Sequence, residues 1–166
     1  MTRRKGLIIE PLASHHDRLN FSCGVDSLDK YLKKQANQDV RRRISRVFVV
    51  TSIDSPETVV GFYTLSTLSI ELSHLPADQA SKLPRHPVPA ALIGRLACAS
   101  NAAGKGIGGM LLADAIKRTL AVSDEIAIFA IVVDALNEQA ANFYAQYGFE
   151  SLTTRSRRMF LPLKSI

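Results

Sequence analysis

The sequence predicts an α/β fold in which helices flank a mixed β-sheet. A strand, a glycine-rich turn and a helix follow one another between Ala91 and Leu120. The run from Ile126 to Val133 contains no polar residue, as expected of a strand that is buried on both faces and has parallel neighbours. The β-branched stretch from Ile44 to Ile53 and the returning stretch from Thr58 to Leu72 predict an antiparallel pair. These three observations predict one sheet containing both kinds of pairing.

Length and charge restrict the organisation and the partners. The 166 residues, of which 46% are apolar, predict a single domain, 1–166, with a full core. A net charge of +6 favours a polyanionic partner such as nucleic acid. No apolar run approaches the length of a membrane span or of a signal sequence. Cys23 and Cys98 form no C-x-x-C motif. We therefore expect a cytoplasmic protein with free thiols that does not bind membranes.

The amino-terminal part predicts a strand, a loop and a helix. The strand extends from Gly6 to Leu12, and the polar loop that follows carries His15 and His16. No other His or Cys lies at ligand spacing, so we expect solvated histidines and no metal site. Asp26 or Ser27 is a suitable cap for a helix from Leu28 to Arg42. Its apolar face consists of Leu28, Tyr31, Leu32, Ala36 and Val40.

Basic residues are concentrated on and just after this helix. Asp39 is the only acidic residue between Lys30 and Arg46. Ion pairs between residues one helical turn apart are therefore nearly absent. A solvated helix face is the simplest interpretation of such a run. The uncompensated repulsion favours a surface that binds nucleic acid. The residues are Lys30, Lys33, Lys34, Arg41, Arg42, Arg43 and Arg46.

The next segments predict a hairpin and a proline-rich loop. Asp54-Ser55-Pro56 is expected to form the hairpin turn, and Gly61 to mark a bulge in the second strand. The segment from His74 to Pro89 contains four of the seven prolines, which predicts a loop with at most a short helix from Ala77 to Leu83. This loop carries Arg85 and is a candidate for the substrate side of the molecule.

The central segment predicts an anion site. Its strand from Ala91 to Ala99 precedes Gly104, Gly106, Gly108 and Gly109, and a helix follows from Ile107 to Leu120. Glycines let the backbone approach a ligand closely, and a helix amino terminus favours a phosphate. No Gly-Lys-Ser/Thr follows, which excludes a P-loop. The glycines also match the dinucleotide pattern G-x-G-x-x-G, but the following acidic residue, Asp134, is too distant.

The carboxyl-terminal part predicts a helix and a hairpin. The helix extends from Asn137 to Tyr147 with Asn137 as its cap. Strands from Phe149 to Thr154 and from Arg158 to Leu163 would complete the sheet.

Two segments resemble one known family. The segment from Asn137 to Glu150 resembles the N…A…FY…GF pattern of the GCN5-related N-acetyltransferases (GNAT). The turn from Ala103 to Gly108 is similar to that family's acyl-CoA pyrophosphate loop, Q/R-x-x-G-x-G/A, with Ala103 in place of the usual Arg or Gln. The resemblance implies the GNAT acyl-CoA N-acyltransferase fold, a central mixed and mostly antiparallel sheet flanked by helices.

The resemblance also implies a cofactor and site residues. The acetyl donor would be acetyl-CoA, and Tyr144 would be the catalytic acid, although pattern alone would place Tyr144 in the core. Cys98 is an alternative nucleophile without an evident His partner. Glu71 and His74 are candidates for a general base that surface positions explain equally well. The residues implied to bind the coenzyme are Leu96, Ala97, Cys98, Ala103, Gly104, Lys105, Gly106, Ile107, Gly108, Gly109 and Asn137.

The rest of the chain resembles a narrower group. The segment from Phe21 to Leu32, and the residues Pro84 to Pro89 leading into Ile93-Gly94-Arg95-Leu96-Ala97, look like the acetyltransferase toxins of type II toxin–antitoxin pairs. This implies acetylation of the α-amine of the amino acid on charged tRNA, which blocks translation.

The same likeness implies a ribbon-helix-helix antitoxin as partner, a complex with it that binds operator DNA as a repressor, and possible homodimers. Arg85 and Arg95 would join the tRNA-binding residues of the helix. The alternatives are a protein or small-amine N-acetyltransferase of the same fold, and a non-catalytic module that binds nucleic acid or a partner.

Overall fold

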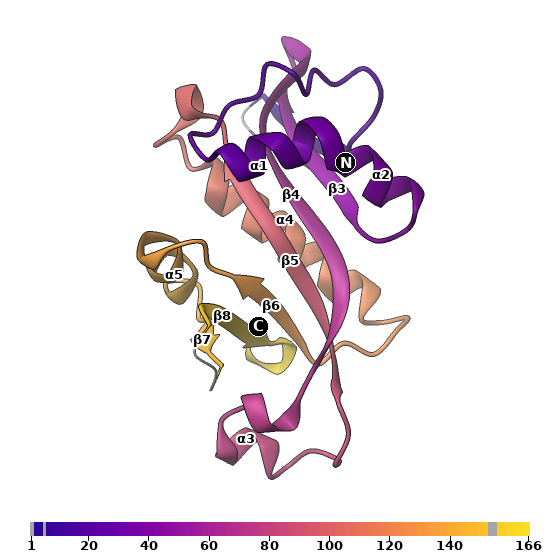
Figure 1. The fold of residues 1–166 in the computed structure, drawn as a ribbon, viewed down its shortest axis with the longest axis vertical. Helices are drawn as coiled ribbons and strands as arrows, with labels where there is room; N and C mark the ends of the chain where they lie inside the picture. Colours follow the sequence, from indigo (N-terminus) through magenta and orange to yellow (C-terminus); the bar gives the residue numbers. More distant parts are fainter. Residues whose placement is uncertain (1, 5, 153–155) are drawn as a thin grey trace. The chain divides into compact units, whose positions relative to one another are not determined.

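The computed structural model describes residues 2–4, 6–152 and 156–166. In this part of the chain, eight strands are hydrogen-bonded in the order β1-β2-β3-β4-β5-β6-β8-β7 (Figure 1). The predicted mixed sheet with flanking helices is confirmed. The chain forms two compact units, Met1–Ser66 with Gly94–Lys117 and Thr67–Ile93 with Arg118–Ile166.

The strands of the first unit are antiparallel. Leu7 pairs with Ser52, and Arg46 pairs with Leu65. The first strand, which precedes Gly6, was not predicted. The predicted turn Asp54-Ser55-Pro56 is wrong for two of its three residues, because Ser52 pairs with Ser55, so that Ser55 and Pro56 belong to the second strand and the turn is Ile53-Asp54. The strands are β1 (Thr2–Arg4), β2 (Leu7–Pro11), β3 (Arg46–Ser52) and β4 (Ser55–Ile70).

The predicted amino-terminal helix is present with an irregular centre. It consists of α1 (Asp26–Lys30), a π-helical turn η1 (Tyr31–Gln35) and α2 (Ala36–Arg41), which are consecutive in Figure 1. Tyr31, Leu32 and Ala36 are buried. The ring of Tyr31 stacks on that of Phe62 in β4 with the centroids 6.3 Å apart. The apolar face predicted for this helix therefore packs on the sheet.

The central strand and helix also agree with the sequence. The strand is β5 (Val88–Cys98), and the helix is α4 (Ile107–Val122). Leu111, Leu112 and Ala115 are fully buried, as the helical spacing of apolar residues requires. The same helix buries Asp114, whose Oδ2 accepts a hydrogen bond of 2.6 Å from the Tyr63 hydroxyl of β4.

The second unit contains the parallel part of the sheet. Residues 90–93 of β5 pair in parallel with residues 130–133 of β6 (Ala130–Asp134). The strand predicted from Ile126 thus starts four residues later. The Ile126 N–H donates to the Val122 carbonyl at 3.0 Å, as in a helical turn, and Ile126 is 68% exposed.

The carboxyl-terminal hairpin is confirmed. The strand β8 (Arg158–Pro162) pairs antiparallel with both β6 and β7 (Glu150–Ser151). Thr153 and Thr154, which belong to the predicted strand, lie outside the described residues. The two helices of this unit are α3 (Ala77–Ala80), shorter than predicted, and α5 (Glu138–Ala145). The core between these elements contains Ile70, Leu75, Val88, Val132, Leu152 and Phe160.

The structure also bears on the cysteines and on membrane-spanning helices. Cys23 and Cys98 are both free and half-buried, in agreement with the expected thiols. Within the described part of the chain, every helix is too short or too polar to cross a lipid bilayer.

Candidate active site

The glycine-rich turn before α4 has the backbone geometry expected of an anion site. Gly104 and Gly106 adopt φ of +79° and +75°, a region that residues with side chains rarely occupy. A Cβ at either position would meet no atom within 4 Å, and residues 103–106 are exposed. The two glycines are therefore required by backbone conformation rather than by crowding, and the turn faces solvent.

Helix α4 supplies the electrostatics at this turn. It has 16 residues and begins at Ile107, so its first N–H groups lack intrahelical partners and its positive dipole end lies beside the turn. Lys105 is exposed in the same turn. A phosphate or a diphosphate fits this arrangement.

The strand that leads into the turn continues beyond its parallel pairing. Pairing with β6 covers residues 90–93, and β5 extends to Cys98. Leu96 and Cys98 are half-buried while Ala97 is buried. Burial raises the pKa of the Cys98 thiol, so the nucleophilic thiolate is disfavoured at neutral pH. This argues against the alternative in which Cys98 is the nucleophile.

Gly61 allows β4 to approach the site closely. The predicted bulge is present here, because Val50 pairs with Gly61 while Thr51 pairs with Val59. A Cβ at Gly61 would lie 3.0 Å from the Ala97 carbonyl oxygen and 3.1 Å from Cγ2 of Ile107. Sequence analysis identified the bulge but not this role. Gly61 lets β4 contact both the strand and the first helical residue of the candidate site.

Replacing Gly61 with alanine tests this role. The added methyl would crowd Ala97, Ile107 and the Val50 side chain, whose Cγ1 would lie 3.0 Å away, so we expect Gly61→Ala to lower the free energy of unfolding by about 1–3 kcal/mol. We also expect the glycine-rich turn to bind its ligand more weakly, which would be measured as a higher KM for acetyl-CoA, the expected acetyl donor. Ala36→Val overpacks the fully buried Ala36 of α2 and is the control. A loss of stability with the same KM in both variants would contradict this role.

The second unit carries Asn137 and Tyr144. The Asn137 side chain accepts a hydrogen bond of 2.9 Å from the Ala140 N–H, which confirms it as the cap of α5. Tyr144 is 6% exposed, and its ring lies 5.2 Å from that of Phe143 and 5.6 Å from that of Phe149. An aromatic cluster thus fixes the position of the Tyr144 ring.

The basic residues near α2 form an exposed surface, which we call the basic patch. Asp39, the only acid in this run, is buried and accepts hydrogen bonds of 2.9 Å from Tyr31 and Gln35. Lys30 forms an exposed ion pair of 2.9 Å with Asp26, a partner that precedes the run. Lys33 is half-buried. The exposed members of the basic patch are Lys30, Lys34, Arg41, Arg42, Arg43 and Arg46.

The two remaining arginines of the prediction lie in different units. Arg95 belongs to the same unit as the basic patch, and its guanidinium carbon lies 3.6 Å from the centroid of the Tyr31 ring. Arg85 is exposed in the proline-rich loop of the other unit. Glu71 and His74 are also exposed there, which agrees with ordinary surface positions.

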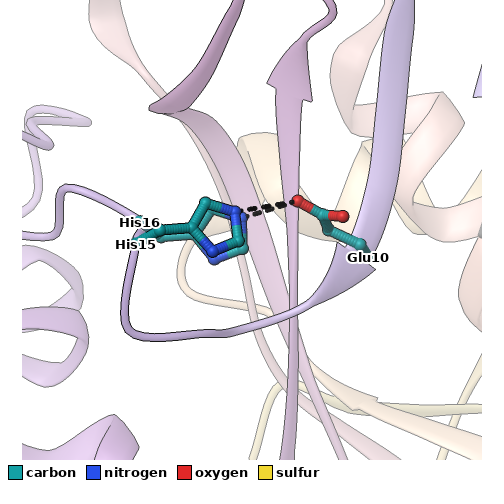
Figure 2. A group of neighbouring side chains, drawn as sticks. All are labelled: Glu10, His15 and His16. Atoms are coloured by element: carbon teal, nitrogen blue, oxygen red, sulfur yellow. Dashed lines mark hydrogen bonds and ion pairs between the residues drawn. The ribbon is translucent and has the colours of Figure 1, made fainter.

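The loop histidines form a hydrogen-bonded group with Glu10 (Figure 2). Nδ1 of His16 accepts the Ala13 N–H at 2.9 Å, so Nε2 carries the proton and donates to Oε1 of Glu10 at 2.8 Å. Nε2 of His15 lies 3.5 Å from the same oxygen. The ligand atoms of this group lie within 4.8 Å of one another, but the proton occupies the lone pair that a metal would need.

The prediction of solvated histidines is therefore wrong for one of the two. His16 is 4% exposed and fixes the loop after β2, whereas the side chain of His15 is 54% exposed.

Comparison with known protein families and sequences gives a consistent result. The model of the acetyltransferase (GNAT) family matches residues 13–149. A probable toxin TacT of Sinorhizobium fredii is 36% identical over 96% of this chain and 92% of its own. A tRNA-acetylating toxin of Mycobacterium tuberculosis is 38% identical over 89% of this chain and 87% of its own.

Solved structures with the same fold contain ligands and partners. AtaT complexed with acetyl-methionyl-tRNAfMet has a TM-score of 0.89 and 31% identity, with 96% of both chains covered. AtaTR bound with acetyl-CoA has a TM-score of 0.85 and 32% identity, covering 98% of this chain and 96% of the other. A KacTA–DNA complex has a TM-score of 0.79 and 31% identity, covering 96% and 94%.

Proposed function

Because this chain belongs to the acetyltransferase (GNAT) family, we propose that it is a toxin that acetylates the amino acid on charged tRNA. It is an acetyl-CoA-dependent N-acetyltransferase, and the acceptor is the α-amine of the esterified amino acid. Acetylation removes the amine needed for peptide-bond formation, so translation stops. The observation that carries the proposal is the 38% identity, over most of the chain, to a tRNA-acetylating toxin.

The donor substrate fits the glycine turn and the start of α4. Acetyl-CoA supplies an activated acetyl thioester and a diphosphate. The exposed turn of residues 103–106 and the first residues of α4, which begins at Ile107, present main-chain N–H groups, which suit the diphosphate. We assign the coenzyme to Ala103, Gly104, Lys105, Gly106, Ile107, Gly108 and Gly109, to the backbone of Leu96, Ala97 and Cys98, and to Asn137.

The chemistry requires a polarised thioester carbonyl, a proton for the departing sulfur and a neutral amine. A main-chain N–H of Leu96 or Cys98 polarises the thioester carbonyl. Tyr144 donates its phenolic proton to the departing sulfur, and the proton that the nitrogen loses on acylation passes to water, from which the phenolate is protonated again. The α-amine, with a reference pKa of about 8, has a useful neutral fraction at pH 7. A lysine amine, with a reference pKa near 10.4, would need a general base. The α-amine of charged tRNA therefore requires least from the enzyme.

The acceptor substrate fits the basic patch. An RNA backbone is a dense polyanion, and Lys and Arg contacts supply most of its salt-sensitive affinity. With Asp39 buried, the surface around Lys34, Arg41, Arg42 and Arg43 keeps its positive charge. We propose that these residues, with Lys30, Lys33, Arg46, Arg85 and Arg95, bind the tRNA.

Reversing two charges of the basic patch tests this assignment. We expect Lys34→Glu with Arg42→Glu to raise the KM for charged tRNA by about tenfold or more, because two phosphate contacts become repulsive. The affinity for acetyl-CoA, measured by calorimetry, is expected to stay the same. Lys117→Glu with Lys164→Glu reverses two other exposed charges and is the control of equal net charge. An equal loss in both double variants would show that only net charge matters.

A protein antitoxin and DNA complete the proposal. The similar toxins KacT and AtaT are found with antitoxin or with DNA. We propose that this chain binds a ribbon-helix-helix antitoxin, that the complex binds operator DNA as a repressor, and that the toxin forms a homodimer. Molecular masses measured by light scattering on the toxin alone and on the toxin with its antitoxin test the homodimer and the antitoxin complex.

Labelled acetyl-CoA tests the reaction itself. We expect label to enter charged tRNA and not deacylated tRNA. Label in proteins or small amines alone would indicate that this chain is a protein or small-amine N-acetyltransferase of the same fold. No transfer to any acceptor would indicate a non-catalytic module.

A further inference from the structure

Arg95 has an unusual environment for a half-buried cation. Its guanidinium carbon lies over the ring of Tyr31, 3.6 Å from the ring centroid. Its backbone N–H donates to Oγ1 of Thr64 at 3.0 Å. Among the residues that the structure describes, no carboxylate forms an ion pair with Arg95 and no acceptor is recorded for its side-chain N–H groups. The guanidinium is therefore held by an aromatic ring, and its N–H groups remain able to donate to a ligand.

Tyr31 is held rigidly enough to position this guanidinium. It is 5% exposed, and its ring also stacks on Phe62. Its hydroxyl donates a hydrogen bond of 2.9 Å to Oδ2 of Asp39, while Gln35 donates to Oδ1 of the same carboxylate. Burial, followed by the bond to Asp39, raises the pKa of Tyr31 to about 12, so Tyr31 remains a neutral donor. Asp39 is thereby engaged with Tyr31 and Gln35.

The sequence position of Arg95 places it beside the proposed chemistry. It immediately precedes Leu96, Ala97 and Cys98 in β5, the residues assigned to the acetyl donor. Its partner Tyr31 begins the turn η1, which also carries Lys33 and Lys34. A guanidinium held by an aromatic ring, with N–H groups able to donate, is suited to bidentate binding of a phosphate. The phosphate would lie between the RNA-binding surface and the acetyl-transfer strand.

We propose that Arg95 binds a phosphodiester in the single-stranded 3′ end of the charged tRNA, and that Tyr31 is the positioning residue that holds the guanidinium for this contact. This inference rests on the proposed function and deepens it. Arg95 recognises the part of the RNA that carries the amine, whereas the basic patch attracts the body of the tRNA. A phosphate of the coenzyme is the other source of the same chemistry.

The experiment compares two acceptors that differ in phosphate. One is charged tRNA, and the other is 3′-O-aminoacyl-adenosine, which has the same reacting amine but no phosphate. For each variant, kcat/KM is measured with both acceptors, together with the KM for acetyl-CoA and the melting temperature. The variants are Arg95→Gln, Arg95→Lys, Tyr31→Leu and Tyr31→Phe.

For Arg95→Gln, we expect the ratio of kcat/KM for charged tRNA to that for aminoacyl-adenosine to fall by about tenfold or more. The salt dependence of tRNA binding should decrease by about one charge. Arg95→Lys keeps the charge and should restore part of the ratio. Tyr31→Leu removes the ring and should lower the ratio as Arg95→Gln does, whereas Tyr31→Phe keeps the ring and should change it less than about threefold.

Three results would overturn the inference. An equal loss with both acceptors indicates that Arg95 is only structural. A rise confined to the KM for acetyl-CoA assigns the phosphate to the coenzyme. Unchanged kcat/KM with both acceptors shows that Arg95 binds no phosphate of the acceptor. If the wild-type protein acetylates aminoacyl-adenosine or another amine but no charged tRNA, the proposed function itself fails, and the inference falls with it.

Discussion

Tyr144→Phe is expected to lower the rate of acetyl transfer by about 10²–10⁴-fold, the usual contribution of a positioned general acid. The substitution removes one oxygen and leaves the ring packed on Phe143 and Phe149. The melting temperature should therefore change little. Single-turnover rates with saturating acetyl-CoA and charged tRNA measure the effect without interference from product release. Expression of the variant should no longer arrest growth.

Tyr147→Phe is the matched control for this experiment. Tyr147 follows the same helix and is 43% exposed, so it loses the same oxygen without an expected effect on rate. A decrease of less than about threefold in Tyr144→Phe would rule out general acid catalysis by this residue. A parallel fall in rate and melting temperature would make Tyr144 a core residue, as its burial alone suggests.

Substitutions in the glycine turn are expected to have the second largest effect. Gly104→Val and Gly106→Val should each raise the KM for acetyl-CoA by about 10–100-fold, since a conformation strained by about 1–3 kcal/mol relaxes and the main-chain N–H groups change direction. There is space for either side chain, because a Cβ would meet no atom within 4 Å. The loss should therefore come from backbone geometry and not from collapse of the core.

Gly6 provides an unusually close control. It also has φ of +79° and open surroundings, but it lies in the turn between β1 and β2. Gly6→Val should have a similar stability cost, measured by thermal unfolding, with an unchanged KM for acetyl-CoA. If all three variants change KM and stability together, the glycine turn has no special role in binding the coenzyme.

The strand, glycine turn and helix of the central segment were predictable because each obeys a local rule. Apolar spacing defined α4, and a positive φ required glycine at Gly104 and Gly106. The cap of α5 followed from the local preference of Asn137 for a helix start. The family resemblance supplied what local rules do not, namely the identity of the ligand and the role of Tyr144. By its pattern alone, Tyr144 is one more buried aromatic residue.

The environment of Asp39 was not predictable in the same way. At about 100° per residue, Asp39 would lie about 80° from Tyr31 around a regular α-helix. The π-turn η1 acts as an insertion of one residue and brings the two side chains to within about 20° of each other. Asp39 therefore faces Tyr31 and is buried, whereas its sequence position shows it only as the single acid within a basic run. The sequence of Tyr31–Gln35 contains no local pattern that predicts the π-turn.

The start of β6 and the burial of His16 differ from the predictions for separate reasons. The apolar run that begins at Ile126 does not indicate where the strand starts. The Ile126 N–H donates to the Val122 carbonyl at the end of α4, and pairing with β5 begins only at Ala130. His16 was expected in solvent because no other His or Cys lies at ligand spacing. Its actual contacts are with Ala13 and Glu10, three and six residues before it, and a search for metal ligands alone does not consider them.

The most direct measurement is mass spectrometry of the reaction product. Wild-type protein is incubated with acetyl-CoA and charged tRNA, and the amino acid is then released by mild base and analysed. We expect the amino acid released from the wild-type reaction to carry one acetyl group on its α-amine. The amino acid released from the reaction with the Tyr144→Phe variant should remain largely unmodified. Unmodified amino acid from the wild-type reaction, or acetyl groups located on the RNA itself, would contradict the assignment of this chain as a tRNA-acetylating toxin.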